Sequence, residues 1–141
     1  MGTGYLGGFG RTSGEKNNET TILIAELRKN GVKFTEKDII FITRDKSGRI
    51  MWLEKGKSSA GLEHILSRHI ADFEKAFGIS KVEIPSFLER VISNGEIVSN
   101  TLIKRNGFWG YERIYYYNGN YCLLTGVGTN GFIVTAYPVE Y

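Results

Sequence analysis

The sequence predicts an α+β fold, in which N-terminal helices and a hairpin are followed by a four-stranded antiparallel meander sheet. Two patterns support this class. Apolar residues recur at helical spacing over residues 61–77, whereas β-rich runs fill the last third of the chain. These runs alternate with Asn-Gly pairs, the favoured pair in tight hairpin turns because both residues tolerate a positive φ. The pairs recur every 12 residues, at 94–95, 106–107, 118–119 and 130–131.

The N-terminal segment has the composition of a linker. Residues 1–18 are rich in Gly, Ser and Asn, so we expect a flexible lead-in or linker remnant before a single domain over residues 19–141. A first helix is expected to begin at Asn18 or Thr20. It should run to about Lys29, where an Asn-Gly pair stops it.

A hairpin and two helices should come next. Strands are expected over 39–42 and 50–53, joined by a turn at 45–48. Helices are expected over 61–77 and 83–93. Further signals mark the helix ends: Ser58 or Ser59 as a cap, Gly78 as a stop and Pro85 in a first turn.

The first Asn-Gly pair should end the second of these helices, and the other three should be hairpin turns. They would join four strands, at 96–103, 108–117, 120–127 and 131–137. In the last strand, alternation places Phe132, Val134 and Ala136 on the core side. Thr135 and Tyr137 would then present hydroxyls on the opposite side.

Composition limits the chemistry. The chain has one cysteine, Cys122, and two histidines, which excludes an internal disulfide, a cysteine zinc site and a multi-histidine metal site. We therefore expect no metal and no cofactor. A net charge of +3 and a pI of about 9.0 give weak support for an anionic partner such as RNA. No stretch is long and apolar enough for a membrane span, and the start does not look like a signal peptide.

Both histidines lie in one motif, Gly61-Leu-Glu-His64-Ile-Leu-Ser-Arg68-His69. On a helix, His64 and Arg68 share a side, whereas His69 lies about 140° from His64, in the apolar sector. The two histidines would therefore point apart, unless His64 lies in a frayed first turn and reaches the side of His69 from the helix start. Taken singly, His69 suits a hydrogen-bonded core histidine, and His64 and Arg68 suit a solvated face. Their clustering within six residues, after a basic loop, instead favours a site for proton transfer.

RNA cleavage without metal needs residues of these types. A base removes the 2′-hydroxyl proton, an acid protonates the leaving 5′-oxygen, and a cation stabilises the phosphorane. Histidine suits both proton transfers because its unperturbed pKa is about 6.5. Arginine suits the phosphate because its planar fork is always charged.

Further candidates lie in the strands and in the loop before the helix. Arg113 shares a strand face with Tyr115 and two other tyrosines, a pattern that can hold phosphate and stack bases, or can simply pack across strands. Lys55 and Lys57 are candidates for RNA backbone contacts, although ordinary solvated lysines have the same pattern. Their loop is not a Walker phosphate loop, because Met51 stands where that motif needs glycine.

The motifs resemble the barnase–EndoU–colicin–RelE superfamily of nuclease toxin domains, over about residues 34–138. The resemblance rests on four segments: Trp52-Leu-Glu-Lys-Gly, the histidine motif, Asp72-Phe73 and Thr129-Asn-Gly-Phe-Ile-Val-Thr-Ala-Tyr-Pro138. It implies N-terminal helices followed by a four-stranded antiparallel sheet. Such domains form the C-terminal toxic tips of polymorphic and contact-dependent inhibition toxins, and some occur in phage proteins.

The resemblance also implies a function. It points to a metal-independent ribonuclease, often one that cuts tRNA, which is neutralised by a cognate immunity protein. Such a domain would be delivered as the tip of a larger toxin and would act in the cytoplasm of the target cell. Carried over to this chain, the family's usual active-site positions are His64 or His69, with Arg113, Thr135 and Tyr137 as strand partners.

Two other classes remain open from the sequence. A non-catalytic RNA-binding module would use the same basic and aromatic surface and would bind without forming products. In a protein-interaction or phage structural domain, both histidines would merely pack.

Overall fold

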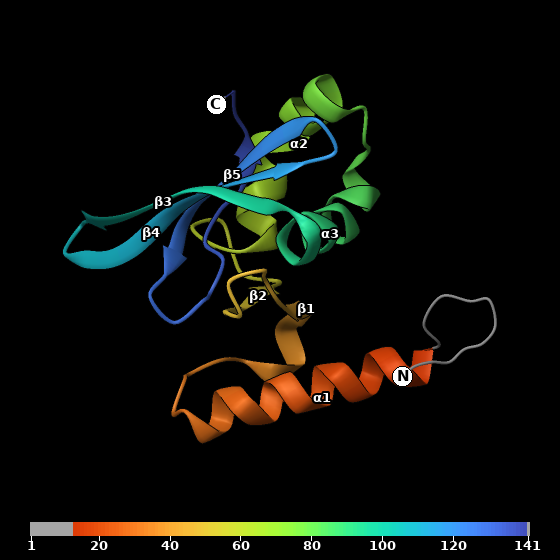
Figure 1. Ribbon diagram of the computed structural model, residues 1–141. Coiled ribbons are helices and arrows are strands. Elements are labelled where there is room, and N and C mark those ends of the chain that lie inside the picture. Colours follow the sequence, from red (N-terminus) through yellow and green to blue (C-terminus); the bar gives the residue numbers. More distant parts are fainter. Residues whose placement is uncertain (1–12, 141) are drawn as a thin grey trace. The chain divides into compact units, whose positions relative to one another are not determined.

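The computed structural model describes residues 13–140, so most of the predicted lead-in, residues 1–12, lies outside the described residues. The chain divides into two compact units, Met1–Glu36 and Lys37–Tyr141. Figure 1 shows the α+β element order predicted from the sequence: a helix and a β-hairpin, then helices, then an antiparallel sheet. In the described part of the chain, no helix is long and apolar enough to cross a membrane.

The first unit contains helix α1 (Ser13–Lys29), which begins earlier than either predicted cap. Glu15 and Lys16 favour helical conformation, so the helix extends into the polar stretch that resembled a linker. The Asn-Gly stop is confirmed, because Gly31 has a φ of 74° and its N–H donates to the Arg28 carbonyl. Beyond the helix, the Arg28 guanidinium pairs with the Glu36 carboxylate.

The second unit starts with the predicted hairpin. After a short 3₁₀ turn, η1 (Glu36–Asp38), strands β1 (Ile39–Arg44) and β2 (Ile50–Glu54) pair antiparallel. The Asp45 side chain stabilises the turn between them, since its Oδ1 accepts the backbone N–H groups of Ser47 and Arg49 at 2.9 and 3.1 Å.

Two helices follow the hairpin: α2 (Leu62–Phe77) and, after the 3₁₀ turn η2 (Lys81–Glu83), α3 (Ile84–Asn94). The left-handed Gly78 ends α2 and Pro85 lies in the first turn of α3, as predicted. The prediction that Ser58 or Ser59 caps α2 is wrong. Both serines lie in a turn closed by Lys57 and Ala60, and Gly61 occupies the cap position without a side-chain hydrogen bond.

The sheet has the strand order β3 (Glu96–Arg105), β4 (Phe108–Tyr117), β5 (Asn120–Gly128) and β6 (Tyr137–Pro138), each strand antiparallel to the next. Two predicted hairpin turns are confirmed, because both residues of the pairs at 106–107 and 118–119 have positive φ. The first pair ends α3, as expected, with Gly95 donating its N–H to the Val91 carbonyl.

The fourth Asn-Gly pair does not form a tight hairpin, and the strand predicted over 131–137 shrinks to Tyr137–Pro138. After β5 the chain leaves the sheet and runs along β2, where Gly131 and Ile133 exchange backbone hydrogen bonds with Trp52. Gly131 allows this close approach, since a Cβ there would lie 2.1 Å from the Ile50 carbonyl oxygen.

This irregular path also corrects the predicted faces of the last segment. Ile133 and Ala136 are fully buried, whereas Phe132 and Val134 are only half-buried. Side chains alternate between two faces only in a β-strand, and most of this segment lies outside β6. The core of the second unit collects residues from both helices, the hairpin and the sheet: Phe41, Met51, Leu53, Ile65, Phe73, Ile84, Leu88, Val91, Ile92, Tyr115, Cys122, Val127, Ile133 and Ala136.

The single cysteine belongs to this core. Burial raises the pKa of the Cys122 thiol to about 12, so the reactive thiolate is scarce at neutral pH. We expect iodoacetamide to alkylate the native protein on the order of 1,000-fold more slowly than a free cysteine, whose pKa is about 8.5. Mass spectrometry over time would measure the rate. Denatured protein is the control and should react fast, whereas fast alkylation of the native protein would contradict the buried position.

Candidate active site

His69 lies on the line of α2 that faces the core, four residues from the fully buried Ile65 and Phe73. Its ring stacks on the Tyr137 ring, with centroids 4.8 Å apart and an interplanar angle of 27°. Its Nδ1 lies 2.8 Å from Oδ2 of Asp72, one turn further along the helix. The side chain is 20% exposed, so the ring is held firmly but remains open to solvent.

His64 lies in the first turn of α2, and the structure brings its ring to that of His69. The two centroids are 6.4 Å apart, in an edge-to-face arrangement. The helical positions alone predicted that the two side chains diverge. The His64 side chain instead folds back over the start of the helix, where its Nδ1 lies 2.9 Å from the Ser58 carbonyl oxygen.

These contacts set the same tautomer on both rings. A carbonyl oxygen can only accept a hydrogen bond, so Nδ1 of His64 carries a proton. An ionised carboxylate also only accepts, so Nδ1 of His69 carries one too. On both rings Nε2 is therefore the nitrogen that accepts a proton when the imidazole is neutral and donates one when it is charged.

The irregular segment that contains Thr135 passes the start of α2, and Tyr137, the first residue of β6, follows it. The Gly61 N–H donates to the Val134 carbonyl at 2.9 Å, and Tyr137 stacks on His69. Thr135 lies between these two contacts. In the part of the chain that the structure describes, its Oγ1 is buried and has no hydrogen-bond partner. A buried hydroxyl in that state is uncommon and is consistent with a partner that arrives with a ligand.

The three predicted substrate-binding cations lie on exposed surface around the start of α2. Lys55 lies 3.9 Å from the Glu63 carboxylate, which anchors it loosely beside the first turn of the helix. Lys57 is exposed in the turn before the helix, and Arg68 is exposed on α2, four residues after His64.

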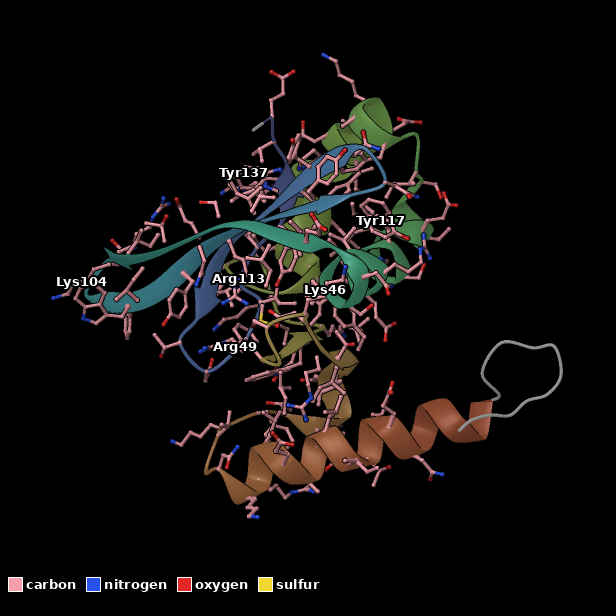
Figure 2. All side chains as sticks on the ribbon, viewed as in Figure 1. Lys46, Arg49, Lys104, Arg113, Tyr117 and Tyr137 are labelled. Carbon is pink, nitrogen blue, oxygen red and sulfur yellow. The ribbon has the colours of Figure 1, made fainter. Side chains whose placement is uncertain are left out.

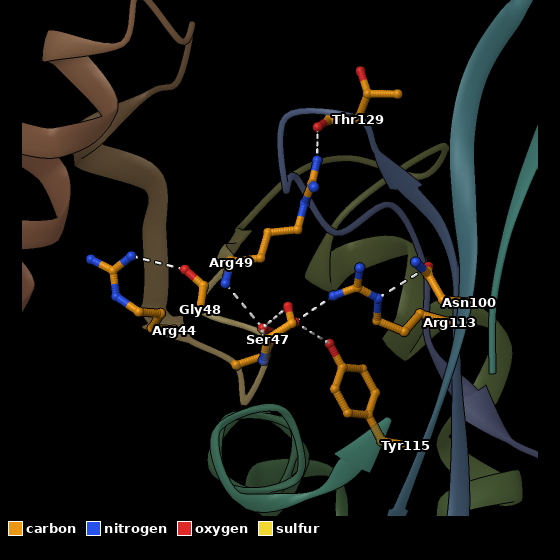
Figure 3. Close-up of polar contacts among 9 residues, drawn as sticks. Arg44, Ser47, Gly48, Arg49, Asn100, Arg113, Tyr115 and Thr129 are labelled. Atoms are coloured by element: carbon orange, nitrogen blue, oxygen red, sulfur yellow. Dashed lines mark hydrogen bonds and ion pairs between the residues drawn. The ribbon is translucent and has the colours of Figure 1, made fainter. Parts of the chain in front are cut away.

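Arg113 and Tyr115 are not part of this cluster. Figure 2 shows Tyr137 and Arg113 well apart. Figure 3 shows Arg113 and Tyr115 pointing toward the β1–β2 turn, where the Arg113 guanidinium pairs with Oδ2 of the fully buried Asp45 side chain. Tyr115 donates its hydroxyl to the same oxygen at 3.2 Å, and Arg113 Nε donates to Asn100 at 3.2 Å.

This second cluster has the character of a buried structural network. Burial, and then the nearby Asp45 carboxylate, raise the pKa of Tyr115 well above its ordinary value, so its hydroxyl remains a donor. Asp45 joins the hairpin turn to the middle of β4. The strand pattern predicted that Arg113 and Tyr115 share a face, but it gave no sign of their partner.

Two residues that the sequence did not single out as site residues complete the two clusters. Asp72 follows His69 at helical i,i+3 spacing, so that spacing could have identified it as a partner. Asp45 was expected only to form a turn. Within residues 13–140, no group of three or more His, Cys, Asp or Glu side chains is placed to hold a metal ion.

No model of a known protein family and no curated protein matches this chain.

Proposed function

We propose that this chain is a metal-independent endoribonuclease that uses the 2′-hydroxyl of RNA as an internal nucleophile and leaves a 2′,3′-cyclic phosphate. The observation that carries the proposal is the pair of imidazoles, His64 and His69, with centroids 6.4 Å apart and both Nδ1 atoms held. Such a pair offers two Nε2 atoms for the two proton transfers that the reaction needs.

The two histidines divide the proton transfers between them. One neutral imidazole accepts the 2′-hydroxyl proton as that oxygen attacks phosphorus. The other, charged, imidazole donates a proton to the 5′-oxygen as the bond from phosphorus to that oxygen breaks. The Asp72 carboxylate accepts the Nδ1–H of His69 and so keeps the ring in one orientation. Because the nucleophile belongs to the substrate, the protein needs no nucleophilic side chain.

Nearby groups support binding of the phosphate. Arg68 is one helical turn from His64 and supplies a permanent charge. The Thr135 hydroxyl has no hydrogen-bond partner among the described residues and suits a phosphate oxygen. Tyr137 positions the His69 ring by stacking on it. Lys55 and Lys57 extend the basic surface toward neighbouring phosphates. In this arrangement Arg113 contributes from a distance, by holding the sheet to the hairpin.

The resemblance to nuclease toxins extends the proposal to a biological setting. We place tRNA first among the substrates, and a cognate immunity protein as the partner that blocks the enzyme in the producing cell. The chain would then be the toxic part of a larger delivered protein and would act in the cytoplasm of the target cell.

The experiment incubates total tRNA with the purified protein in EDTA. We expect cleavage products whose 3′ ends carry a cyclic phosphate, which mass spectrometry distinguishes from an open phosphate. An oligonucleotide with 2′-deoxyribose at the cut position is the control and should stay intact. Absence of cleavage in all conditions would remove the enzymatic proposal, and cleavage only with added metal would remove its mechanism. Salt-sensitive binding without products would leave the RNA-binding alternative.

A further inference from the structure

The β3–β4 hairpin carries an aromatic and basic face that the proposed active site does not use. Figure 1 shows this hairpin extending away from α2 and α3, and Figure 2 shows Lys104 at its far end. Cross-strand pairing puts six residues on one face: Asn100, Leu102 and Lys104 of β3 opposite Arg113, Tyr111 and Trp109 of β4. We call these six residues the hairpin face.

At the end of β4 that lies near the helices, the strand side that carries the hairpin face is buried in the core. Tyr115 is fully buried, and Tyr117 meets the Phe87 ring of α3 edge-on at 6.3 Å. Towards the hairpin end, the same side becomes exposed, with Trp109 at 55% and Leu102 at 51%. Large apolar side chains gathered on an exposed surface are typical of a binding site.

Cations lie over the rings of the hairpin face. Lys104 Nζ is 5.7 Å from the centroid of Trp109, directly opposite it in the pairing. Two guanidinium groups, those of Arg49 and Arg113, lie 5.2 and 5.9 Å from the Tyr111 centroid. None of the six residues of the hairpin face is acidic. Glu112, the acidic residue of β4, points to the other side and pairs with Arg105.

We propose that the hairpin face binds single-stranded RNA, with a base stacked on Trp109 and a backbone phosphate on Lys104; this inference rests on the proposed ribonuclease function and assigns that enzyme a second contact with its substrate. Rings with adjacent cations fit nucleic acid because every base has a face to stack and every nucleotide carries a negative charge. The rings need unpaired bases, since a duplex keeps its bases stacked on one another. Protein surfaces rich in acidic groups would match the cations but not the requirement for flat rings to stack.

The test uses RNA that cannot be cut. A fluorescein-labelled oligonucleotide with 2′-O-methyl groups lacks the nucleophile, so anisotropy measures binding alone. We expect Trp109→Ala to weaken binding of the single strand by about 5- to 100-fold. Lys104→Ala should lower the slope of log Kd against log salt by about 0.7. Phe108→Ala is the matched control. Phe108 is 79% exposed and is the neighbour of Trp109, but it points to the opposite side of the hairpin, so its loss should leave the affinity unchanged.

Intrinsic fluorescence gives a second readout. The chain has two tryptophans, and Trp52 is fully buried, so quenching by the single strand would report on Trp109. The inference is overturned if Trp109→Ala binds as tightly as the wild-type chain or if Phe108→Ala loses as much affinity. It is also overturned if the same oligonucleotide, annealed to its complement, binds as well as the single strand. Binding that depends on Trp109 in a chain that cuts no RNA would support the hairpin face and remove the proposed nuclease. Cleavage by a chain whose RNA binding does not depend on Trp109 would support the proposed nuclease and remove the hairpin face as an RNA-binding surface.

Discussion

His69→Ala is expected to slow RNA cleavage by about 100- to 10,000-fold, the usual contribution of a positioned acid or base. The variant loses the Nε2 that transfers a proton and frees Asp72, which is exposed and tolerates the loss of its partner. The fold should survive, because the His69 side chain is 20% exposed and is not among the fully buried core residues. Single-turnover cleavage of a labelled tRNA, with circular dichroism of the same samples, would measure both effects.

His64→Ala should cause a loss of similar size for the same reason. The double variant should be little slower than either single one, because residues that act as a unit are not additive. Glu74→Ala is the matched control, since Glu74 is exposed on the same helix and belongs to neither histidine's contacts. If both histidine variants cut at the wild-type rate while Glu74→Ala also stays active, the imidazole pair is not the catalyst.

The elements that the sequence predicted well depend on local signals. The hairpin turns at 106–107 and 118–119 form because two residues alone decide whether a tight turn is possible. The period of α2 likewise predicted that His69 faces the sheet, and it does, against Tyr137. Helical position could not predict His64, because rotation about its side-chain bonds carries the ring back over the helix start to the Ser58 carbonyl.

The features that the sequence did not predict depend on contacts between residues that are far apart along the chain. The pair at 130–131 has the same residues as the other turns, yet packing of Gly131 against β2 takes the chain out of the sheet. Arg113 lies 68 residues from Asp45, and neither residue carries a local sign of the other. The strand pattern therefore placed Arg113 correctly among the tyrosines of β4 but could not indicate its partner Asp45.

Arg113→Met is expected to lower the free energy of unfolding by about 3–5 kcal/mol, the cost of leaving a buried charge without its partner. The Asp45 side chain is fully buried, and its other donors, which include the turn N–H groups and the Tyr115 hydroxyl, are neutral. Urea unfolding followed by circular dichroism would measure the change. Arg105→Met is the matched control on the same hairpin. Its ion pair with Glu112 is exposed, so its loss should cost about 0–1 kcal/mol.

A double variant separates the ion pair from the other contacts of Asp45. Asp45→Asn retains an oxygen for the turn N–H groups, and combined with Arg113→Met it leaves no buried charge. The double variant should therefore be more stable than the sum of the single losses implies. Activity then decides the role of Arg113. If the folded double variant still cuts RNA, the arginine only holds β4 to the hairpin. If Arg113→Met stays as stable as Arg105→Met but cuts nothing, the arginine acts on the substrate and the network is not what stabilises the fold.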